Sequence, residues 1–149
     1  MDKIDSHEII QVCIIVKDIE KTARNYAQLF GVELPPIKLI PPAEIAHTTF
    51  KGKATNTRAK ICSFRMGAIS LELNQPDDEP SVWKEFLDTR GEGVCYLGLW
   101  VDDAVETIQF LGDHAIPLVH RGEYPGGNYN CVDSTEKLGV ILNIKQNDH

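Results

Sequence analysis

The chain has 149 residues, of which 42% are hydrophobic, and a formal net charge of −7, which fits one globular domain or two small halves that share a core. The negative charge argues against nucleic acid and anionic membranes as partners, because both bind through basic protein surfaces. No apolar run approaches the ~20 residues that span a bilayer, and the polar start MDKIDSHE carries no secretory signal, so we expect a cytoplasmic protein.

A strand and a helix are expected first. Residues 8–16 are mostly apolar on both faces, which is typical of a strand in a sheet that helices cover. Gln11 and Cys13 share one face of this strand. Asp18 is a favourable N-cap and Gly31 a favourable helix end, so the sequence predicts a helix between them.

The rest of the first half is less regular. The two Pro-Pro pairs of ELPPIKLIPPAE favour an extended segment. The polar stretch IAHTTFKGKATNT predicts a strand or a loop over the mouth of a cleft, and the role of residues 41–57 stays open. The stretches RAKICSFRM and AISLELNQ predict a hairpin that turns at Met66 and Gly67. Pro80 then suits the first turn of a short helix.

The second half repeats this order. A short glycine-rich hinge, TRGEG, precedes a predicted strand at 94–101, and an aspartate caps a helix at about 103–112. A strand at 116–121, a glycine-rich loop, and strands near 129–133 and 138–146 follow.

The two halves are related by an internal repeat. The segment IIQVCIIVKDIEKTARNYAQLFGV returns as GVCYLGLWVDDAVETIQFLGDHAI, which pairs Gln11 with Tyr96. The segments AISLELNQ and GVILNIKQ also correspond, which pairs Glu72 with Asn143. A duplicated unit of this kind predicts two similar halves that face each other across a cleft, with the four paired side chains inside it.

The expected fold class is α+β, with two tandem βαβββ modules that form a cleft between curved mixed sheets. We expect one domain over 1–149. Its first module spans about 8–76, a helical connector about 77–92, and its second module about 93–146.

Several of these segments resemble the vicinal oxygen chelate superfamily, which includes glyoxalases, ring-cleaving dioxygenases, bleomycin and fosfomycin resistance proteins and methylmalonyl-CoA epimerase. They are QVCIIVKDIEKTARNYAQLFGV, ISLELNQP with SVWKEFLDTRGEGVCYLGLWVDD, and GVILNI. The stretch from Ile69 to Asp103 is most similar to methylmalonyl-CoA epimerases. The resemblance implies an enzyme that acts beside a carbonyl as an epimerase, isomerase or lyase, and a homodimer.

The resemblance also implies a metal site at the four paired positions, where metal-dependent members carry two histidines and two acidic or amide residues. Here Gln11 and Tyr96 stand where histidine is usual, and Asn143 stands where a glutamate is usual. Only Glu72 supplies charge, and one carboxylate offsets little of the desolvation cost of a divalent ion. We therefore expect no tight metal site, although a weakly bound divalent metal remains an alternative.

Glu72 is the candidate catalytic base, because burial beside Trp100 or Tyr96 raises the pKa of a carboxyl group toward neutrality. Gln11, Tyr96, Asn143 and Trp100 are the candidate ligand-binding residues. The alternative interpretation is a closed polar network in which Gln11, Tyr96 and Asn143 only satisfy the carboxylate.

Two further functions stay open beside the enzyme. One is a non-catalytic protein that binds or sequesters a small molecule in the manner of bleomycin resistance proteins, in which tryptophan and tyrosine rings hold a cationic ligand. The other is an accessory domain that acts through protein contacts. The histidines at 47 and 120 are expected at the surface, and the four cysteines, which form no CxxC pair, are expected to be reduced and buried.

Overall fold

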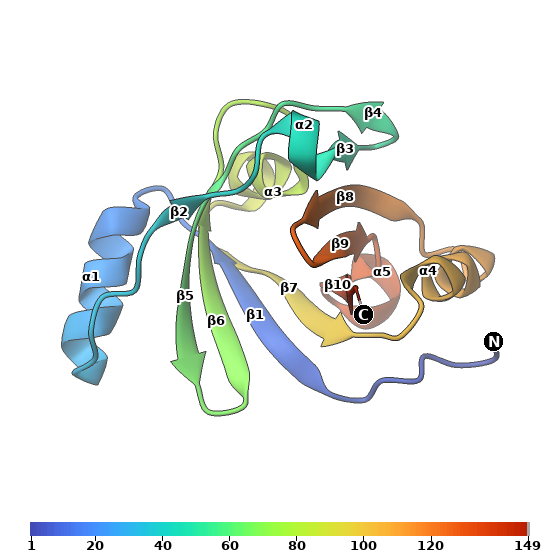
Figure 1. Ribbon diagram of the computed structural model, residues 1–149, viewed down its shortest axis with the longest axis horizontal. Coiled ribbons are helices and arrows are strands. Elements are labelled where there is room, and N and C mark those ends of the chain that lie inside the picture. Colours follow the sequence, from blue (N-terminus) through green and yellow to red (C-terminus); the bar gives the residue numbers. More distant parts are fainter. Residues whose placement is uncertain (149) are drawn as a thin grey trace.

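The computed structural model describes residues 1–148, which form one curled ten-stranded sheet with helices around it (Figure 1). The strands are β1 (Ile9–Ile15), β2 (Lys38–Leu39), β3 (Thr49–Phe50), β4 (Lys53–Ala54), β5 (Lys60–Met66), β6 (Ile69–Gln75), β7 (Gly93–Trp100), β8 (Leu118–Tyr124), β9 (Gly127–Val132) and β10 (Ile141–Asn147). The helices are α1 (Ile19–Phe30), α2 (Ala43–Ala46), α3 (Val82–Arg90), α4 (Ala104–Asp113) and α5 (Thr135–Leu138). No helix in this part of the chain is both long enough and apolar enough to cross a membrane.

The two expected βαβββ units are present, so the predicted fold class is confirmed. The strand order is β2-β5-β6-β1-β7-β10-β9-β8-β3-β4. Strand β1 pairs in parallel with β6, and β7 pairs in parallel with β10, so each half places its first strand beside its last. The strands β1 and β7 are antiparallel neighbours at the centre of the sheet, which brings the repeated positions of both halves onto one concave surface.

The same local signal starts the long helix of each half. The carboxylate of Asp18 accepts a hydrogen bond from the backbone N–H of Lys21 at 3.1 Å, and that of Asp103 accepts one from Glu106 at 3.0 Å. Each bond satisfies a backbone donor that the first helical turn leaves open. Gly31 ends α1 in the left-handed conformation, with φ of 65°, which favours glycine.

The long helices cover the convex face of the sheet. Ile19, Ala23 and Ala27 of α1 pack with Phe64 and Leu73 of the first half. Helix α4 does the same in the second half, where its buried Leu111 packs with Leu142 and Ile144. A third cluster fills part of the concave side, where α3 inserts Trp83 beside Cys13 and Tyr96. The concave surface is thus partly filled from one side, and the remaining space is the candidate site.

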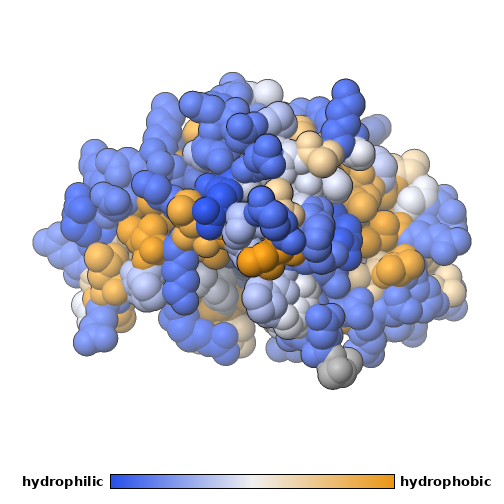
Figure 2. All heavy atoms as spheres, turned by 45° about the horizontal axis from the view of Figure 1, so that its top comes forward, coloured by the Kyte–Doolittle hydropathy of each residue, from blue (hydrophilic) through white to orange (hydrophobic). Residues whose placement is uncertain are grey.

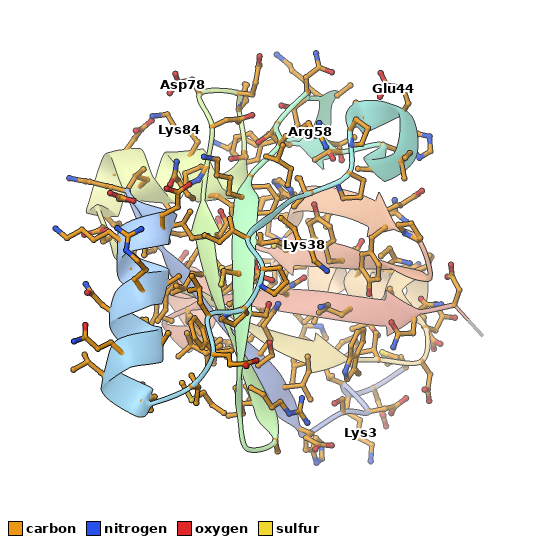
Figure 3. The ribbon with its side chains drawn as sticks, turned by 60° about the vertical axis from the view of Figure 1, so that its left-hand side comes forward. Lys3, Lys38, Glu44, Arg58, Asp78 and Lys84 are labelled. Atoms are coloured by element: carbon orange, nitrogen blue, oxygen red, sulfur yellow. The ribbon has the colours of Figure 1, made fainter. Side chains whose placement is uncertain are left out.

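The segment between β2 and β5 closes one end of the curl. It forms α2 and the β3–β4 hairpin, and β3 pairs with β8 of the second half, with Phe50 opposite His120 (Figure 1). Arg58, labelled in Figure 3, donates from Nε to the carbonyl of Ile40 at 3.0 Å. Its backbone N–H donates to Asp77 at 2.8 Å. The stretch that was expected to be a strand or a loop therefore forms a short helix and a hairpin. The pairing with β8 holds the hairpin, and the hydrogen bonds of Arg58 hold the end that leads into β5.

The four cysteines are free and buried, as expected.

The histidines differ from one another. His47 is exposed and its Nδ1 lies 3.0 Å from Glu123 Oε2. His120, expected at the surface, has none of its side chain exposed. The expectation was wrong because it rested on the polar neighbours of His120 in the sequence, whereas Trp83, Phe50 and Tyr129 cover the ring in space.

Candidate functional site

The four residues paired by the repeat line one cavity on the concave side of the sheet. Its volume is about 240 Å³, and Gln11, Glu72, Tyr96 and Asn143 all contribute to its wall. They meet there because β1, β6, β7 and β10 are consecutive neighbours in the sheet and alternate side chains of a strand point to one face. Apolar and aromatic groups complete the wall, and among them are Ile61, Trp83, Tyr124 and Tyr129.

A continuous chain of hydrogen bonds joins the four side chains. Asn143 Nδ2 donates to Gln11 Oε1 at 3.1 Å, and Gln11 Nε2 donates to Glu72 Oε2 at 3.0 Å. The hydroxyl of Tyr96 donates to Glu72 Oε1 at 3.4 Å. Each oxygen of the Glu72 carboxylate therefore accepts one hydrogen bond. One comes from Gln11 and the other from Tyr96, so both branches of the chain end at Glu72.

The direction of this chain is fixed by a donor at each end. Trp83 Nε1, which can only donate, lies 3.2 Å from the Tyr96 hydroxyl, so that hydroxyl directs its own hydrogen toward Glu72. At the other end the backbone N–H of Asn130 donates to Asn143 Oδ1 at 3.1 Å. This orients the amides of Asn143 and Gln11, because each carbonyl oxygen faces an incoming donor. All donors thus converge on one carboxylate.

Glu72 is held in an environment that changes its acidity. Its side chain is partly buried, and this burial raises the pKa of Glu72 above the ordinary value for glutamate. The positive charge of Lys145 and the hydrogen bonds act in the opposite direction, but burial dominates. The pKa of Tyr96 is raised well above its ordinary value, mainly by burial, so Tyr96 is a neutral hydrogen-bond donor in this site.

Lys145 lies in the same cavity and was not among the residues expected there. It follows Asn143 by two residues on β10 and therefore points to the same face. Its Nζ lies 4.8 Å from the centroid of the Trp100 ring and 5.8 Å from that of Tyr124. Burial lowers the pKa of Lys145, while the charge of Glu72 raises it. The alternation of β10 is the sequence signal that could have identified this residue.

Asn74 is a second unexpected residue of the cavity. It follows Glu72 by two residues on β6, is fully buried, and lines the cavity wall. Neither its carbonyl oxygen nor its amide nitrogen has a hydrogen-bond partner among the described residues. The carboxamide lies near enough to Glu72 to favour the carboxylate, although it falls outside hydrogen-bond geometry. Buried polar groups are normally satisfied, so this pair of open atoms is unusual.

A second cavity, of about 460 Å³, adjoins the first. Gln11, Glu72 and Lys145 line both, so they form the boundary between an inner and an outer cavity. Trp100, expected with the ligand-binding residues, lines the outer cavity and is 37% exposed. Arg65 also lines the outer cavity. Of the five expected residues, four therefore meet in the inner cavity, and Trp100 lies beyond Lys145.

The donor set does not fit a divalent metal ion. No group of three or more histidine, cysteine, aspartate or glutamate side chains suited to a metal occurs among residues 1–148. The carbonyl oxygens of Gln11 and Asn143 already accept hydrogen bonds from protein donors. Tyr96 is a neutral phenol, and the ammonium of Lys145 adds positive charge to the same cavity. A divalent ion needs several anionic or imidazole donors, which these residues do not supply.

Comparison with solved structures shows where else this fold occurs. Methylmalonyl-CoA epimerase from Mycobacterium tuberculosis superposes with a TM-score of 0.63 at 21% identity, over 100% of this chain and 93% of that chain. A Streptomyces coelicolor methylmalonyl-CoA epimerase in complex with 2-nitronate-propionyl-CoA gives a TM-score of 0.65 at 16% identity, over 97% and 100% of the two chains. At these identities the similarity establishes the fold alone.

Comparison with curated sequences gives shorter matches. Hemolysin VllY of Vibrio vulnificus is 29% identical over 92 residues, which are 61% of this chain and 25% of that protein. The uncharacterized protein YqjC of Bacillus subtilis is 24% identical over 90 residues, 58% of this chain and 64% of its own length. The chain thus matches less than two thirds of either relative. The family model with the description Glyoxalase/Bleomycin resistance protein/Dioxygenase superfamily matches residues 10–132, and the chain belongs to this superfamily.

Proposed function

We propose that this protein is an enzyme that moves a proton at a carbon beside a carbonyl group, as an epimerase, isomerase or lyase related to the methylmalonyl-CoA epimerases. Glu72 is the base. The observation that carries the proposal is the convergence of fixed donors on one partly buried carboxylate that faces two cavities. A base with a raised pKa removes a weakly acidic carbon-bound proton more readily than an ordinary carboxylate does.

The neighbours of Glu72 have supporting roles in this proposal. Each of its oxygens accepts one protein hydrogen bond and keeps a second lone pair for a substrate proton. Gln11 and Tyr96 hold the carboxylate in one orientation, which lowers the entropic cost of the transfer step. Asn143 acts through Gln11 and is a positioning residue.

The test is exchange of the substrate proton with solvent. Methylmalonyl-CoA, propionyl-CoA and 2-oxobutyrate are incubated with the protein in D₂O, and loss of the signal from the proton beside the carbonyl is followed by NMR. Catalysed exchange of any of them supports the proposal. The variant Glu72→Gln should abolish exchange but keep ligand affinity, because it removes the base and preserves the side-chain shape. Equal loss of both, or full exchange by the variant, excludes Glu72 as the base.

A protein that binds a small molecule without turnover is the second candidate. The aromatic wall formed by Trp83, Tyr124 and Tyr129 favours it. A cationic ligand is disfavoured, because the ammonium of Lys145 already faces the rings of Trp100 and Tyr124 and repels a second cation. Saturable binding with no proton exchange in the whole panel would support this candidate.

We further propose that the protein is a cytoplasmic homodimer. Hydrophilic residues cover most of the face seen in Figure 2, with separate apolar patches between them. Leu29, Phe30, Val32, Leu34 and Leu39 are exposed over α1, the segment after it and β2, and exposed apolar groups of this kind favour a protein contact. Light scattering at two protein concentrations measures the oligomeric state.

A further inference from the structure

The proposed function uses Glu72 as the base and assigns no role to Lys145, the cation that lines both cavities. The ammonium of Lys145 faces the rings of Trp100 and Tyr124 at 4.8 and 5.8 Å. Among the described residues, no carboxylate lies within ion-pair distance of it. Ring faces do not accept hydrogen bonds as an oxygen does, so the N–H donors of this ammonium remain open to the cavities.

The position of Lys145 is fixed by the sheet. Strand β10 runs between β7 and β9, and Lys145 lies opposite Trp100 on one side and Tyr129 on the other. The side chain lines the inner and the outer cavity together with Glu72. A ligand that reaches Glu72 therefore interacts electrostatically with the ammonium of Lys145.

Asn74 is an independent sign that the inner cavity receives a polar ligand. Its two side-chain polar atoms are buried, line this cavity and have no partner among residues 1–148. It occupies the position of the first half that corresponds to Lys145 in the second, two residues after Glu72 and Asn143 respectively. In the sheet, β1 and β7 separate β6 from β10, so Asn74 and Lys145 approach the cavity from different sides with Glu72 on the side of Asn74.

We propose that the cleft selects a small oxo acid, whose carboxylate binds the ammonium of Lys145 and whose carbonyl group contacts the carboxamide of Asn74. This inference names the substrate class of the site described under the proposed function and rests on that proposal for the choice of site. The carboxylate neutralises the open cation, and the carbonyl satisfies the amide N–H of Asn74. In 2-oxobutyrate the exchangeable protons are on the carbon at the far side of the carbonyl from the carboxylate, and this carbon then lies on the side of Glu72, as the proposed reaction requires.

The test compares 2-oxobutyrate with its neutral amide, 2-oxobutyramide, so that ligand charge changes and ligand shape is nearly kept. Tryptophan fluorescence reports binding, because the two tryptophans of the chain line the inner and outer cavities. We expect saturable binding of the acid and at least tenfold weaker binding of the amide. Lys145→Met should reduce the affinity for the acid to that for the amide, and Lys145→Arg should restore most of it.

Lys53→Met is the matched control, because it removes the same charge from an exposed position on β4 outside both cavities. It should leave the affinity for the acid unchanged. Equal affinity for acid and amide, binding by Lys145→Met as tight as by the unmodified protein, or no saturable binding of either compound overturns the inference. The two proposals fail separately. If binding depends on Lys145 but no proton exchange occurs, only the proposed function is overturned. If exchange depends on Glu72 but is unchanged by Lys145→Met, only this inference is overturned.

Discussion

Gly98 lies opposite Gln11 in the β1–β7 pair, and the absence of a side chain at Gly98 makes room for the Gln11 amide. A Cβ atom built at Gly98 would lie 2.7 Å from Gln11 Oε1 and 2.8 Å from Gln11 Cβ. Two backbones are paired here, so the conflict cannot be relieved by a shift of a flexible side-chain end alone. The hydrogen-bond chain to Glu72 thus depends on a glycine in the neighbouring strand.

The substitution Gly98→Ala should disconnect Gln11 from Glu72. We expect it to destabilise the protein by about 1–3 kcal/mol, as overpacking of a core typically does, and to lower any Glu72-dependent proton exchange. Urea unfolding and the NMR exchange assay measure the two effects. Gly112→Ala is the control, because Gly112 lies in α4 and a Cβ there meets no atom within 4 Å. It should stabilise the protein by about 0.5–1 kcal/mol. A Gly98→Ala variant as stable as this control would contradict the prediction.

We expect the titration of Glu72 to lower the free energy of unfolding as the pH rises. Its folded-state pKa is raised, mainly by burial, so the folded protein binds the proton more tightly than the unfolded chain. The contribution of this proton is fully present below the unfolded-state pKa of about 4.3 and is lost as the pH rises through the folded-state pKa. Glu72→Gln removes this dependence, so the variant should gain stability over the unmodified protein between pH 4 and pH 8.

Denaturant unfolding at several pH values measures that difference. Glu136→Gln, at an exposed position of α5, is the matched control for the loss of one negative charge. A stability difference between Glu72→Gln and the unmodified protein that is the same at every pH would show that the carboxyl group titrates alike in the folded and unfolded chains.

The sequence predicted those parts of the fold and site that depend on local signals and on the repeat. Asp18 and Asp103 cap their helices as expected, because capping involves only the next few residues. The alternation of strand residues, together with the repeat, placed Gln11, Glu72, Tyr96 and Asn143 on one surface. Their direction of hydrogen bonding was not predictable, because it is set by Trp83 and by the backbone of Asn130.

Other features depend on contacts between distant segments. The pairing of β3 with β8 joins residues about seventy positions apart, and no local pattern in the polar stretch before β5 signals it. Lys145 and Asn74 were not predicted, because the repeat pairs only Gln11 with Tyr96 and Glu72 with Asn143, although strand alternation places both residues on the same face. The burial of His120 follows from α3 and β3 packing over it, which the sequence around it does not show.

His120 should make the protein sensitive to acid. Burial lowers the pKa of His120 to about 3, so the folded protein holds it neutral while the unfolded chain takes up a proton below about pH 6.5. The stability that neutral His120 provides is present above that pH and is lost as the pH falls toward 3, at up to about 1.4 kcal/mol per pH unit. His120→Asn keeps an acceptor for the Val82 N–H, which His120 Nδ1 accepts at 3.2 Å, and does not titrate.

The comparison is made by urea unfolding at pH 7, 5.5 and 4. The loss of stability between pH 7 and pH 4 should be smaller in His120→Asn than in the unmodified protein. The exposed residue His47 supplies the control, since His47→Asn removes a histidine that is not buried. Equal acid sensitivity of His120→Asn and the unmodified protein would assign the acid sensitivity to other groups.

Asn74→Leu should separate stability from ligand binding. Both polar atoms of Asn74 are buried without a partner among residues 1–148, and such an atom costs about 1–3 kcal/mol. Leucine has a similar shape and no polar atom, so we expect the ligand-free variant to be more stable than the unmodified protein. The same variant should bind 2-oxobutyrate more weakly, because the carbonyl of the ligand loses the amide that it contacts.

Asn130→Leu is the contrasting variant, since Asn130 is equally buried but its Nδ2 donates to Asn128 Oδ1 at 2.8 Å and to the carbonyl of Ile144 at 2.9 Å. Leucine at 130 breaks both bonds and leaves their acceptors open, so this variant should be destabilised. Thermal unfolding with and without 2-oxobutyrate measures both effects. If Asn74→Leu is more stable than the unmodified protein and binds 2-oxobutyrate more weakly, Asn74 serves ligand binding. Its polar atoms then destabilise the ligand-free folded protein. A loss of stability in Asn74→Leu as large as in Asn130→Leu would instead mean that the carboxamide of Asn74 serves the fold.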